Sequence, residues 1–353
     1  MARKIDGVVR VAIIGSGSIA GAHIQGFIKY SDRFRVIGLC DTLPEAIRLR
    51  TDQLTKSGLA APRAFDDWRR MLKELQGQVD AVDICLPHHL HCPAILDAAA
   101  AGLHILCEKP MCIELKQADQ IADAVRKAGV TYMSAHNQLF MPVVQETKRI
   151  IDSGELGAIY TLRSQDCFKA GHPGPTPQPR ANWSWRADLD TQGGGELIDT
   201  GYHPSYRLLY LAGSPVSEVR ASMSRFRCNI DGDDTSIVAV RFANGTLGEV
   251  HTSWAYDMPY GTHHIHVIAQ KGQIFGSDDT LFYLPTGFTE PAKRVFAPVD
   301  TYIAQLEHFA ECLQQGKRPI HSIEEGRAVL ELISKAATSA EGWQPTAPWP
   351  LSR

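Results

Sequence analysis

The chain has 353 residues, of which 44% are hydrophobic and 21% charged, with a formal net charge of −3. This near-neutral balance gives no reason to expect nucleic acid or a membrane surface as a partner, and no apolar run of about eighteen residues predicts a membrane span. The length exceeds what one hydrophobic core usually serves, so two domains are expected.

The first predicted elements are a strand over 9–14 and a helix over 18–29, joined by a Gly-x-Gly-x-x-Ala turn. Gly15 permits the tight turn, Gly17 lets backbone N–H groups approach a pyrophosphate at the positive end of a helix, and Ala20 allows close helix–strand packing. The pattern predicts a dinucleotide site with these cofactor-binding residues: Gly15, Gly17, Ser18, Ile19 and Ala20.

A second predicted strand, over 34–40, runs into Asp41. The carboxylate of Asp41 is placed to accept hydrogen bonds from the hydroxyls of an adenosine ribose, and it would repel the 2′-phosphate of NADP. No arginine stands beside it in the next three residues. We therefore expect NAD as the cofactor and consider NADP disfavoured.

Short strands and helices go on alternating up to about residue 135. The predicted strands cover 79–86, 104–107 and 130–135, and the predicted helices cover 44–57, 66–75, 92–101 and 114–128. This alternation is typical of a doubly wound parallel sheet in an α/β domain.

The strand predicted over 104–107 ends in Glu108-Lys109-Pro110. It delivers a lysine at the carboxyl end of a strand, where ligands bind in open α/β sheets. The alternative for an isolated Lys-Pro is a surface lysine before a turn. A bond before proline can also be cis, which would fix the direction of the lysine.

From about residue 136 the pattern becomes α+β. Helices are predicted over 143–153, 196–212, 301–315 and 323–340, and strands over 235–243, 246–254, 263–270, 273–277 and 280–284. Asn244-Gly245 is a strong two-residue hairpin signal. Consecutive strands with tight turns predict a mainly antiparallel sheet.

Asp199 and His203 follow three consecutive glycines at the start of the helix predicted over 196–212. Four residues apart on one helix face, their side chains are close enough to cooperate. The alternative is an exposed pair or a helix-capping arrangement.

Taken together, these motifs resemble the glucose–fructose oxidoreductase / inositol dehydrogenase / MocA family over nearly the whole chain. The resemblance rests on the nucleotide turn, Glu-Lys-Pro, and Gly-Gly-Gly followed by Asp-x-x-x-His. Trp185-Arg186, and Asn137 followed by Phe140 and Pro142, also look like that family. It implies a Rossmann domain over 1–135 and an α+β domain over 136–353 with an open sheet used for oligomer contacts.

The resemblance also implies a hydride transfer between NAD and a secondary alcohol of a sugar, sugar derivative or cyclitol. Lys109, Asp199 and His203 match the family's catalytic trio. Further cofactor contacts are implied for Leu86, Pro87, His88, His91, Glu108 and Lys109. Substrate contacts are implied for Lys109, Asn137, Trp185, Arg186, Asp199, Tyr202 and His203.

The chemistry assigns a role to each member of the trio. His203 suits the base that takes the alcohol proton, because its ordinary pKa is near neutrality. Lys109 would stabilise the developing alkoxide, and Asp199 would bind a neighbouring hydroxyl or orient His203. Two positions depart from the family pattern: His88 stands where asparagine is usual, and Leu139 where arginine is usual.

Two other functions share this fold. A glycoside-cleaving enzyme would use transient oxidation by bound NAD to permit elimination, and a sensor would bind the nucleotide without catalysis. No metal is expected: of the histidines at 263, 264 and 266 only His264 and His266 would share a strand face, without an acidic partner nearby.

The partner and compartment follow from the same observations. Eight scattered cysteines without Cys-x-x-Cys, and an N-terminus without the apolar core of a signal peptide, favour a reduced cytoplasmic setting. The open sheet implies a homo-oligomer, a dimer or a tetramer.

Overall fold

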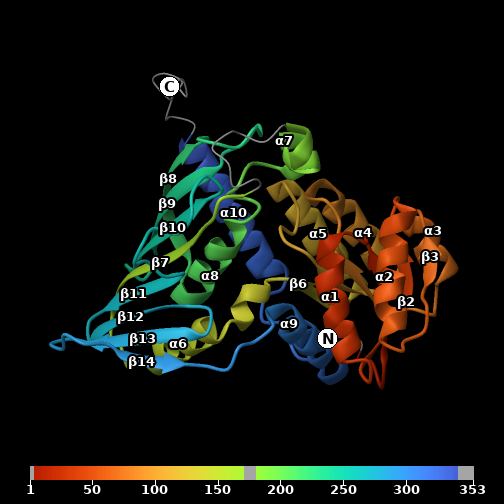
Figure 1. The fold of residues 1–353 in the computed structure, drawn as a ribbon, viewed down its shortest axis with the longest axis horizontal. Helices are drawn as coiled ribbons and strands as arrows, with labels where there is room; N and C mark the ends of the chain where they lie inside the picture. The colour runs from red at the N-terminus through yellow and green to blue at the C-terminus, as the bar shows by residue number, and fades with distance from the viewer. Residues whose placement is uncertain (1–3, 171–179, 341–353) are drawn as a thin grey trace.

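Two β-sheets lie toward opposite ends of the molecule, with helices α8, α9 and α10 between them (Figure 1). The computed structural model describes residues 4–170 and 180–340. Within these ranges no helix has the length and apolar character needed to cross a membrane.

The first sheet has six parallel strands in the order β3-β2-β1-β4-β5-β6. They are β1 (Val9–Ile14), β2 (Phe34–Cys40), β3 (Arg63–Phe65), β4 (Ala81–Ile84), β5 (His104–Cys107) and β6 (Tyr132–Ser134). The strand order reverses at β1, which pairs with β2 on one side and β4 on the other. Ligands bind at such a reversal, beyond the carboxyl ends of the strands.

Five helices connect these strands, and their ends lie within two residues of the predicted ones. They are α1 (Ser18–Lys29), α2 (Pro44–Lys56), α3 (Trp68–Glu74), α4 (His91–Ala100) and α5 (Leu115–Ala128). Local chemistry sets several of these ends. The Asp67 carboxylate accepts the N–H of Arg70 at 2.7 Å at the start of α3, and Gly129 ends α5 with a φ of +65°. The three-residue strand β3 was not predicted, because it is too short to show a pattern.

The second sheet has eight strands in the order β14-β13-β12-β11-β7-β10-β9-β8. They are β7 (Ile159–Cys167), β8 (Val216–Ser224), β9 (Thr235–Phe242), β10 (Leu247–Ser253), β11 (Ile265–Ala269), β12 (Gly272–Ser277), β13 (Thr280–Pro285) and β14 (Ala292–Val295). All neighbouring pairs are antiparallel except β7 with β10. The predicted fold class is confirmed, and the hairpin at Asn244-Gly245 joins β9 and β10 as expected. Strands β8 and β14 were not predicted.

Four longer helices that follow β6 in the chain pack on and between the two sheets. They are α6 (Pro142–Ser153), α8 (Tyr202–Ala212), α9 (Thr301–Gln315) and α10 (Ile323–Ala340). Helix α8 packs on β7 and β10, α10 packs on both β8 and α5, and α9 packs on α1. One buried apolar cluster therefore continues from β4 and β5 into the second sheet. The domain boundary predicted at 135 falls just after β6 and stays a prediction.

The helix predicted over 196–212 begins only at Tyr202, so Asp199 and His203 do not share a helix face. The segment before it is bound to a neighbouring loop instead. The N–H groups of Glu196 and Leu197 donate to the carbonyl and the carboxylate of Asp233, at 2.8 and 3.1 Å. A Cβ on Gly195 would lie 2.2 Å from the Asp233 carbonyl oxygen, so only glycine permits this approach. These contacts with Asp233 therefore keep residues 196–201 out of the helix that their sequence pattern predicts.

Candidate active site

A cleft of about 730 Å³ follows the carboxyl ends of β2, β1, β4 and β5. Its floor begins at the glycine turn, where Gly15 has a φ of +95° and a Cβ would lie 2.3 Å from the carbonyl oxygen of Cys85. A Cβ on Gly17 would face open space, and no side chain caps the start of α1. The first N–H groups of α1 are thus free to bind a phosphate, and the cleft fits a dinucleotide.

Asp41 closes the adenosine end of this cleft. Its two carboxylate oxygens accept the N–H of Ser16 at 2.7 Å and the N–H of Leu43 at 2.9 Å. Asp66 and Asp67 also line this end. Among the described lining residues, the only lysine and arginine are Lys109 and Arg186, both at the reacting end. Arg50, which donates to the Ser16 carbonyl at 3.2 Å, and Arg70, which pairs with Asp66, lie nearby but do not line the cleft. The carboxylates on the lining itself therefore oppose a 2′-phosphate beside Asp41.

Most of the predicted cofactor residues line the cleft: Gly15, Gly17, Ser18, Ile19, Asp41, Leu86, Pro87, His88, Glu108 and Lys109. Ala20 is fully buried, so its part is the close packing of α1. His91 does not reach the cleft, which corrects the prediction of a cofactor contact. Its ring nitrogens lie 2.6 Å from the carbonyl oxygen of Pro110 and 2.8 Å from that of Leu86. His91 therefore links the loop that follows β5 to the loop that follows β4.

Several lining residues were missed, including Thr42, Leu43, Trp68 and Tyr302. The position of Thr42 and Leu43 just beyond β2 was a usable signal, since loops at the carboxyl ends of parallel strands form such sites. Trp68 follows the unrecognised strand β3. Tyr302 comes from α9, far along the chain, and nothing in the sequence places it here.

Lys109 and Asp199 form the ion pair at the reacting end. Lys109 Nζ donates to Asp199 Oδ1 at 2.8 Å and to the Asp199 carbonyl oxygen at 2.9 Å, and the Lys109–Pro110 peptide is cis. Arg186 Nε donates to Asp199 Oδ2 at 2.6 Å. Burial alone would raise the pKa of Asp199, but the charges of Lys109 and Arg186 hold it well below its ordinary value. Asp199 is therefore an ionised anchor for two cations.

His203 lies in the same cleft and is neutral at neutral pH. Burial, reinforced by the charge of Lys109, lowers its pKa well below the ordinary value. Its Nδ1 lies 2.7 Å from the hydroxyl of Tyr206, which also accepts the N–H of Gln138 at 3.0 Å. A neutral imidazole can accept a proton, and Tyr206, which was not predicted, fixes its orientation.

His88, in the loop after β4, packs against Trp185 and so holds the segment that carries Arg186 against the part of the chain that forms the first sheet. The rings of His88 and Trp185 meet edge to face at 4.5 Å, and the Arg186 guanidinium lies 4.1 Å from the Trp185 ring centroid. His88 Nδ1 donates to the Gln192 carbonyl at 2.9 Å, and burial lowers the pKa of His88 to about 3. His88 thus docks this segment as a neutral ring. Leu139, the other departure from the family pattern, is fully buried in the core.

Two predicted substrate residues lie elsewhere. Tyr202 is fully buried and its hydroxyl donates to the Gly326 carbonyl on α10 at 3.0 Å, so it faces away from the cleft and that prediction was wrong. Asn137 donates to Thr301 Oγ1 at 2.8 Å and lines a second cavity.

This second cavity, of about 550 Å³, adjoins the cleft, because Tyr302 lines both. Three carboxylates, of Asp166, Asp278 and Asp279, line it together with His264. The His264 ring lies 3.7 Å from the carboxylates of both Asp166 and Asp278, so the expectation that it lacks an acidic neighbour was wrong. Asp166 comes from β7, and Asp278 and Asp279 come from the turn between β12 and β13.

Comparisons with known proteins agree with this architecture. The family model described as "Oxidoreductase family, NAD-binding Rossmann fold" matches residues 9–136, and the GFO/IDH/MocA C-terminal domain matches residues 144–275. A myo-inositol 2-dehydrogenase from Thermotoga maritima is 26% identical, with 94% of this chain and 96% of the relative covered. A D-glucoside 3-dehydrogenase from Escherichia coli K12 is also 26% identical, with 94% and 95% covered.

A solved structure of levoglucosan dehydrogenase in complex with NADH and levoglucosan has the same fold. It superposes with a TM-score of 0.82 at 22% identity, covering 95% of this chain and 97% of that one. Both sheets therefore belong to one shared architecture.

Proposed function

The chain belongs to the GFO/IDH/MocA family of NAD-binding oxidoreductases, and we propose that it is a dehydrogenase for a secondary alcohol of a sugar, sugar derivative or cyclitol. The observation that carries this proposal is the meeting, in one cleft, of the nucleotide turn with the Lys109–Asp199 pair and a neutral His203. The relatives named above act on cyclitol and glucoside alcohols, which supports this substrate class.

Oxidising an alcohol removes a hydride from carbon and a proton from oxygen. Bound NAD supplies the hydride acceptor. His203 takes the hydroxyl proton on the ring nitrogen that does not face Tyr206. Its Nδ1 hydrogen then donates to Tyr206, whose hydroxyl accepts two hydrogen bonds. The neutral state of His203 leaves it free to act as this base.

Lys109 stabilises the oxygen as negative charge develops on it. Asp199 holds the ammonium group of Lys109 through two contacts and is itself held by Arg186. Because Asp199 stays ionised, its part is to aim Lys109 rather than to accept a proton. NAD is the cofactor and NADP is disfavoured, since Asp41, Asp66 and Asp67 gather at the adenosine end.

The second cavity holds the remainder of the substrate. Its walls offer carboxylates, an imidazole, the hydroxyl of Thr200 and the ring of Tyr302, which suit a ring bearing several hydroxyls. The described residues lining it include no lysine or arginine. The buried Arg207 pairs with Asp166 at 3.2 Å, but Asp278 and Asp279 leave negative charge on the wall, so a carboxylate on this part of the substrate would be repelled. A neutral polyol, or one bearing an amino group, is the expected class.

The decisive test is a screen of cyclitols, aldoses, amino-substituted polyols and sugar acids with NAD and NADP, followed by NADH absorbance. We expect stoichiometric NADH from a neutral or amino-substituted polyol and little activity with the acids. Product release without net NADH would favour the glycoside-cleaving alternative. NAD binding without turnover of any alcohol would favour the sensor.

A homo-oligomer through the second sheet, in a cytoplasmic setting, completes the proposal. Ile237 on β9, Leu247 on β10 and Ile268 on β11 are each more than 40% exposed, and they lie among charged side chains such as Arg163 and Glu249. The eight cysteines are all unpaired and buried, as suits a reducing compartment. Analytical ultracentrifugation should give a dimer or tetramer that Ile237→Asp weakens, and a monomer for the unaltered chain would contradict this.

A further inference from the structure

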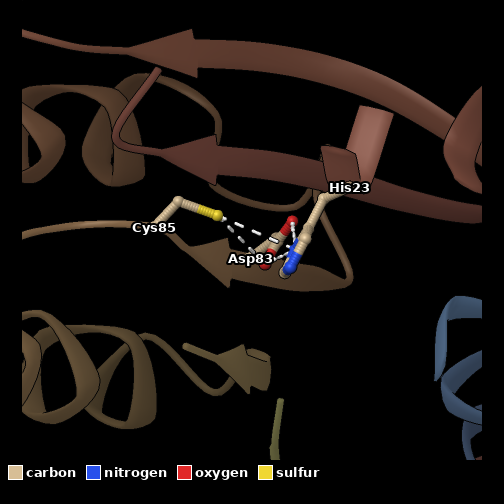
Figure 2. Close-up of side chains that lie close together, drawn as sticks. All are labelled: His23, Asp83 and Cys85. Carbon is tan, nitrogen blue, oxygen red and sulfur yellow. Dashed lines mark hydrogen bonds and ion pairs between the residues drawn. The ribbon is translucent and has the colours of Figure 1, made fainter. Parts of the chain in front are cut away.

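A buried charged cluster lies beside the cleft, and the chemistry above does not use it. His23, on α1, is fully buried and its Nδ1 lies 2.9 and 3.0 Å from the two carboxylate oxygens of Asp83 on β4. Figure 2 shows the His23 ring pointing at Asp83, with the thiol of Cys85 beside them. On the other side of the ring, Nε2 lies 2.9 Å from Glu108 Oε1.

Carboxylates on both sides make His23 an imidazolium, because each ring nitrogen then has an acceptor for its own hydrogen. Burial alone would lower the pKa of His23, but the charge of Asp83 raises it well above the ordinary value. His23, Asp83 and Cys85 are close enough together to hold a metal ion. Both ring nitrogens already donate to carboxylates, however, so the cluster is complete as an ion pair.

Glu108 connects this cluster to the reacting end. Its second oxygen, Oε2, accepts the backbone N–H of Lys109 at 3.1 Å. Gln305, on α9, places its side-chain amide group 3.1 Å from His23 Nε2, and the amide oxygen, which has no other hydrogen-bond partner among the described residues, faces the imidazolium when the amide is turned over. One ring therefore joins the helix that receives the pyrophosphate, two strands of the first sheet, and a helix from the far end of the chain.

We propose that His23 is a positioning residue for Lys109: as a fixed cation between Asp83 and Glu108, it holds the carboxylate that anchors the Lys109 backbone. The inference rests on the proposed function for the role of Lys109. The Lys109 ammonium must reach Asp199 from the end of β5, so its reach depends on where that strand end is fixed. Without His23, two buried carboxylates lose their shared cation, and Glu108 turns away from the Lys109 N–H.

The first test is a double-mutant cycle with His23→Gln and Glu108→Gln. Each single variant should lower kcat about 10- to 100-fold, as expected for misplacement of a catalytic group. In His23→Gln the affinity for NAD, from a fluorescence titration, should change less than threefold, because His23 is fully buried and does not line the cleft. The double variant should be no slower than the slower single variant, since both act along one path. The proposal would be overturned if the fold-losses in kcat of the two single variants multiplied in the double variant. It would also be overturned if kcat of His23→Gln stayed within twofold of the unaltered enzyme.

The second test needs no turnover. Acetylation of Lys109 by acetic anhydride, followed by peptide mass spectrometry, reports whether its amine stays engaged with Asp199. We expect faster acetylation of Lys109 in His23→Gln and a smaller increase in Asp83→Asn. Asp83→Asn is the variant to use for this test if His23→Gln does not fold. Ile121→Ala, a fully buried change in α5 away from the cleft, is the matched control for lost stability and should leave the rate unchanged.

The two tests separate this inference from the proposed function. Absence of any alcohol oxidation by the unaltered chain would defeat the proposed function, while the acetylation result would still decide whether His23 places Lys109. Equal acetylation of Lys109 in His23→Gln and the unaltered chain would overturn the inference even if the dehydrogenase activity is found.

Discussion

The two ends of the cleft are built in different ways. At the nucleotide end, backbone N–H groups and one carboxylate come from a single stretch between Gly15 and Leu43. At the reacting end, Lys109 and Asp199, which are 90 residues apart along the chain, meet as an ion pair. The first construction depends on local geometry and the second on the packing of the whole molecule. Substitutions should therefore separate cofactor binding from turnover.

The largest expected effect comes from Lys109. Lys109→Met keeps the length of the side chain but removes the charge, and we expect kcat to fall about 10³-fold or more because charge on the oxygen is no longer stabilised. The affinity for NAD should stay within about threefold of the unaltered value, since the pyrophosphate binds at the glycine turn and at the start of α1, away from Lys109. Steady-state kinetics and a fluorescence titration check both. An equal loss of NAD affinity would show that the two ends are not independent.

His203 should follow. We expect His203→Gln to lower kcat about 10²-fold to 10³-fold, as is typical when a general base is lost. In the unaltered enzyme the pKa of His203 lies well below the ordinary value of 6.5, so the base stays deprotonated as pH falls toward mild acidity. The kcat/KM profile should thus stay level below pH 6.5 and drop only once the imidazole takes a proton. A midpoint at or above 6.5 would contradict the assignment.

Asp41 tests the nucleotide end. Asp41→Ala should raise KM for NAD about tenfold by removing the ribose acceptor, while leaving kcat within about twofold. Discrimination against NADP should fall at the same time. Asp41→Asn is the matched control, because it removes the charge but retains an acceptor for Ser16. A large drop in kcat for either variant would break the comparison between the two ends.

The smallest effect on turnover is expected at Asp233, which lies beneath the loop that carries Asp199. Burial raises its pKa to about 6, from an ordinary 3.8. The folded state therefore binds the proton more tightly than the unfolded chain, and this stabilisation is present at low pH and is lost as pH rises through about 6. A shift of roughly two units corresponds to about 3 kcal/mol of unfolding free energy.

Asp233→Asn should flatten the loss of stability between pH 4 and 7 while changing kcat less than the three substitutions above. Urea unfolding at several pH values measures this slope. An unchanged slope in Asp233→Asn would show that another group, such as the buried Glu196, whose pKa burial also raises, carries the dependence.

The sequence by itself determined the elements whose conformation depends on residues close to one another in the chain. The strand, glycine turn and helix from Val9 to Lys29 follow local backbone rules, and Asp41 lies where the end of β2 must place it. The alternation of strands and helices was sufficient for the parallel sheet, and Asn244-Gly245 for a hairpin. Lys109, Asp199 and His203 were identified from sequence motifs, but a motif does not tell how far apart their side chains lie in space.

Only the tertiary structure decided how the reacting end is assembled. Asp199 leaves the predicted helix because its loop bonds to Asp233, and this contact is invisible to any local pattern. Tyr302, from α9, reaches the cleft, while Tyr202, next to His203, turns into the core. Such placements depend on which distant surfaces pack together, and burial then sets the protonation of His203 and the ionic anchoring of Lys109. Local geometry accordingly specifies where the nucleotide binds, and long-range packing specifies how the alcohol is oxidised.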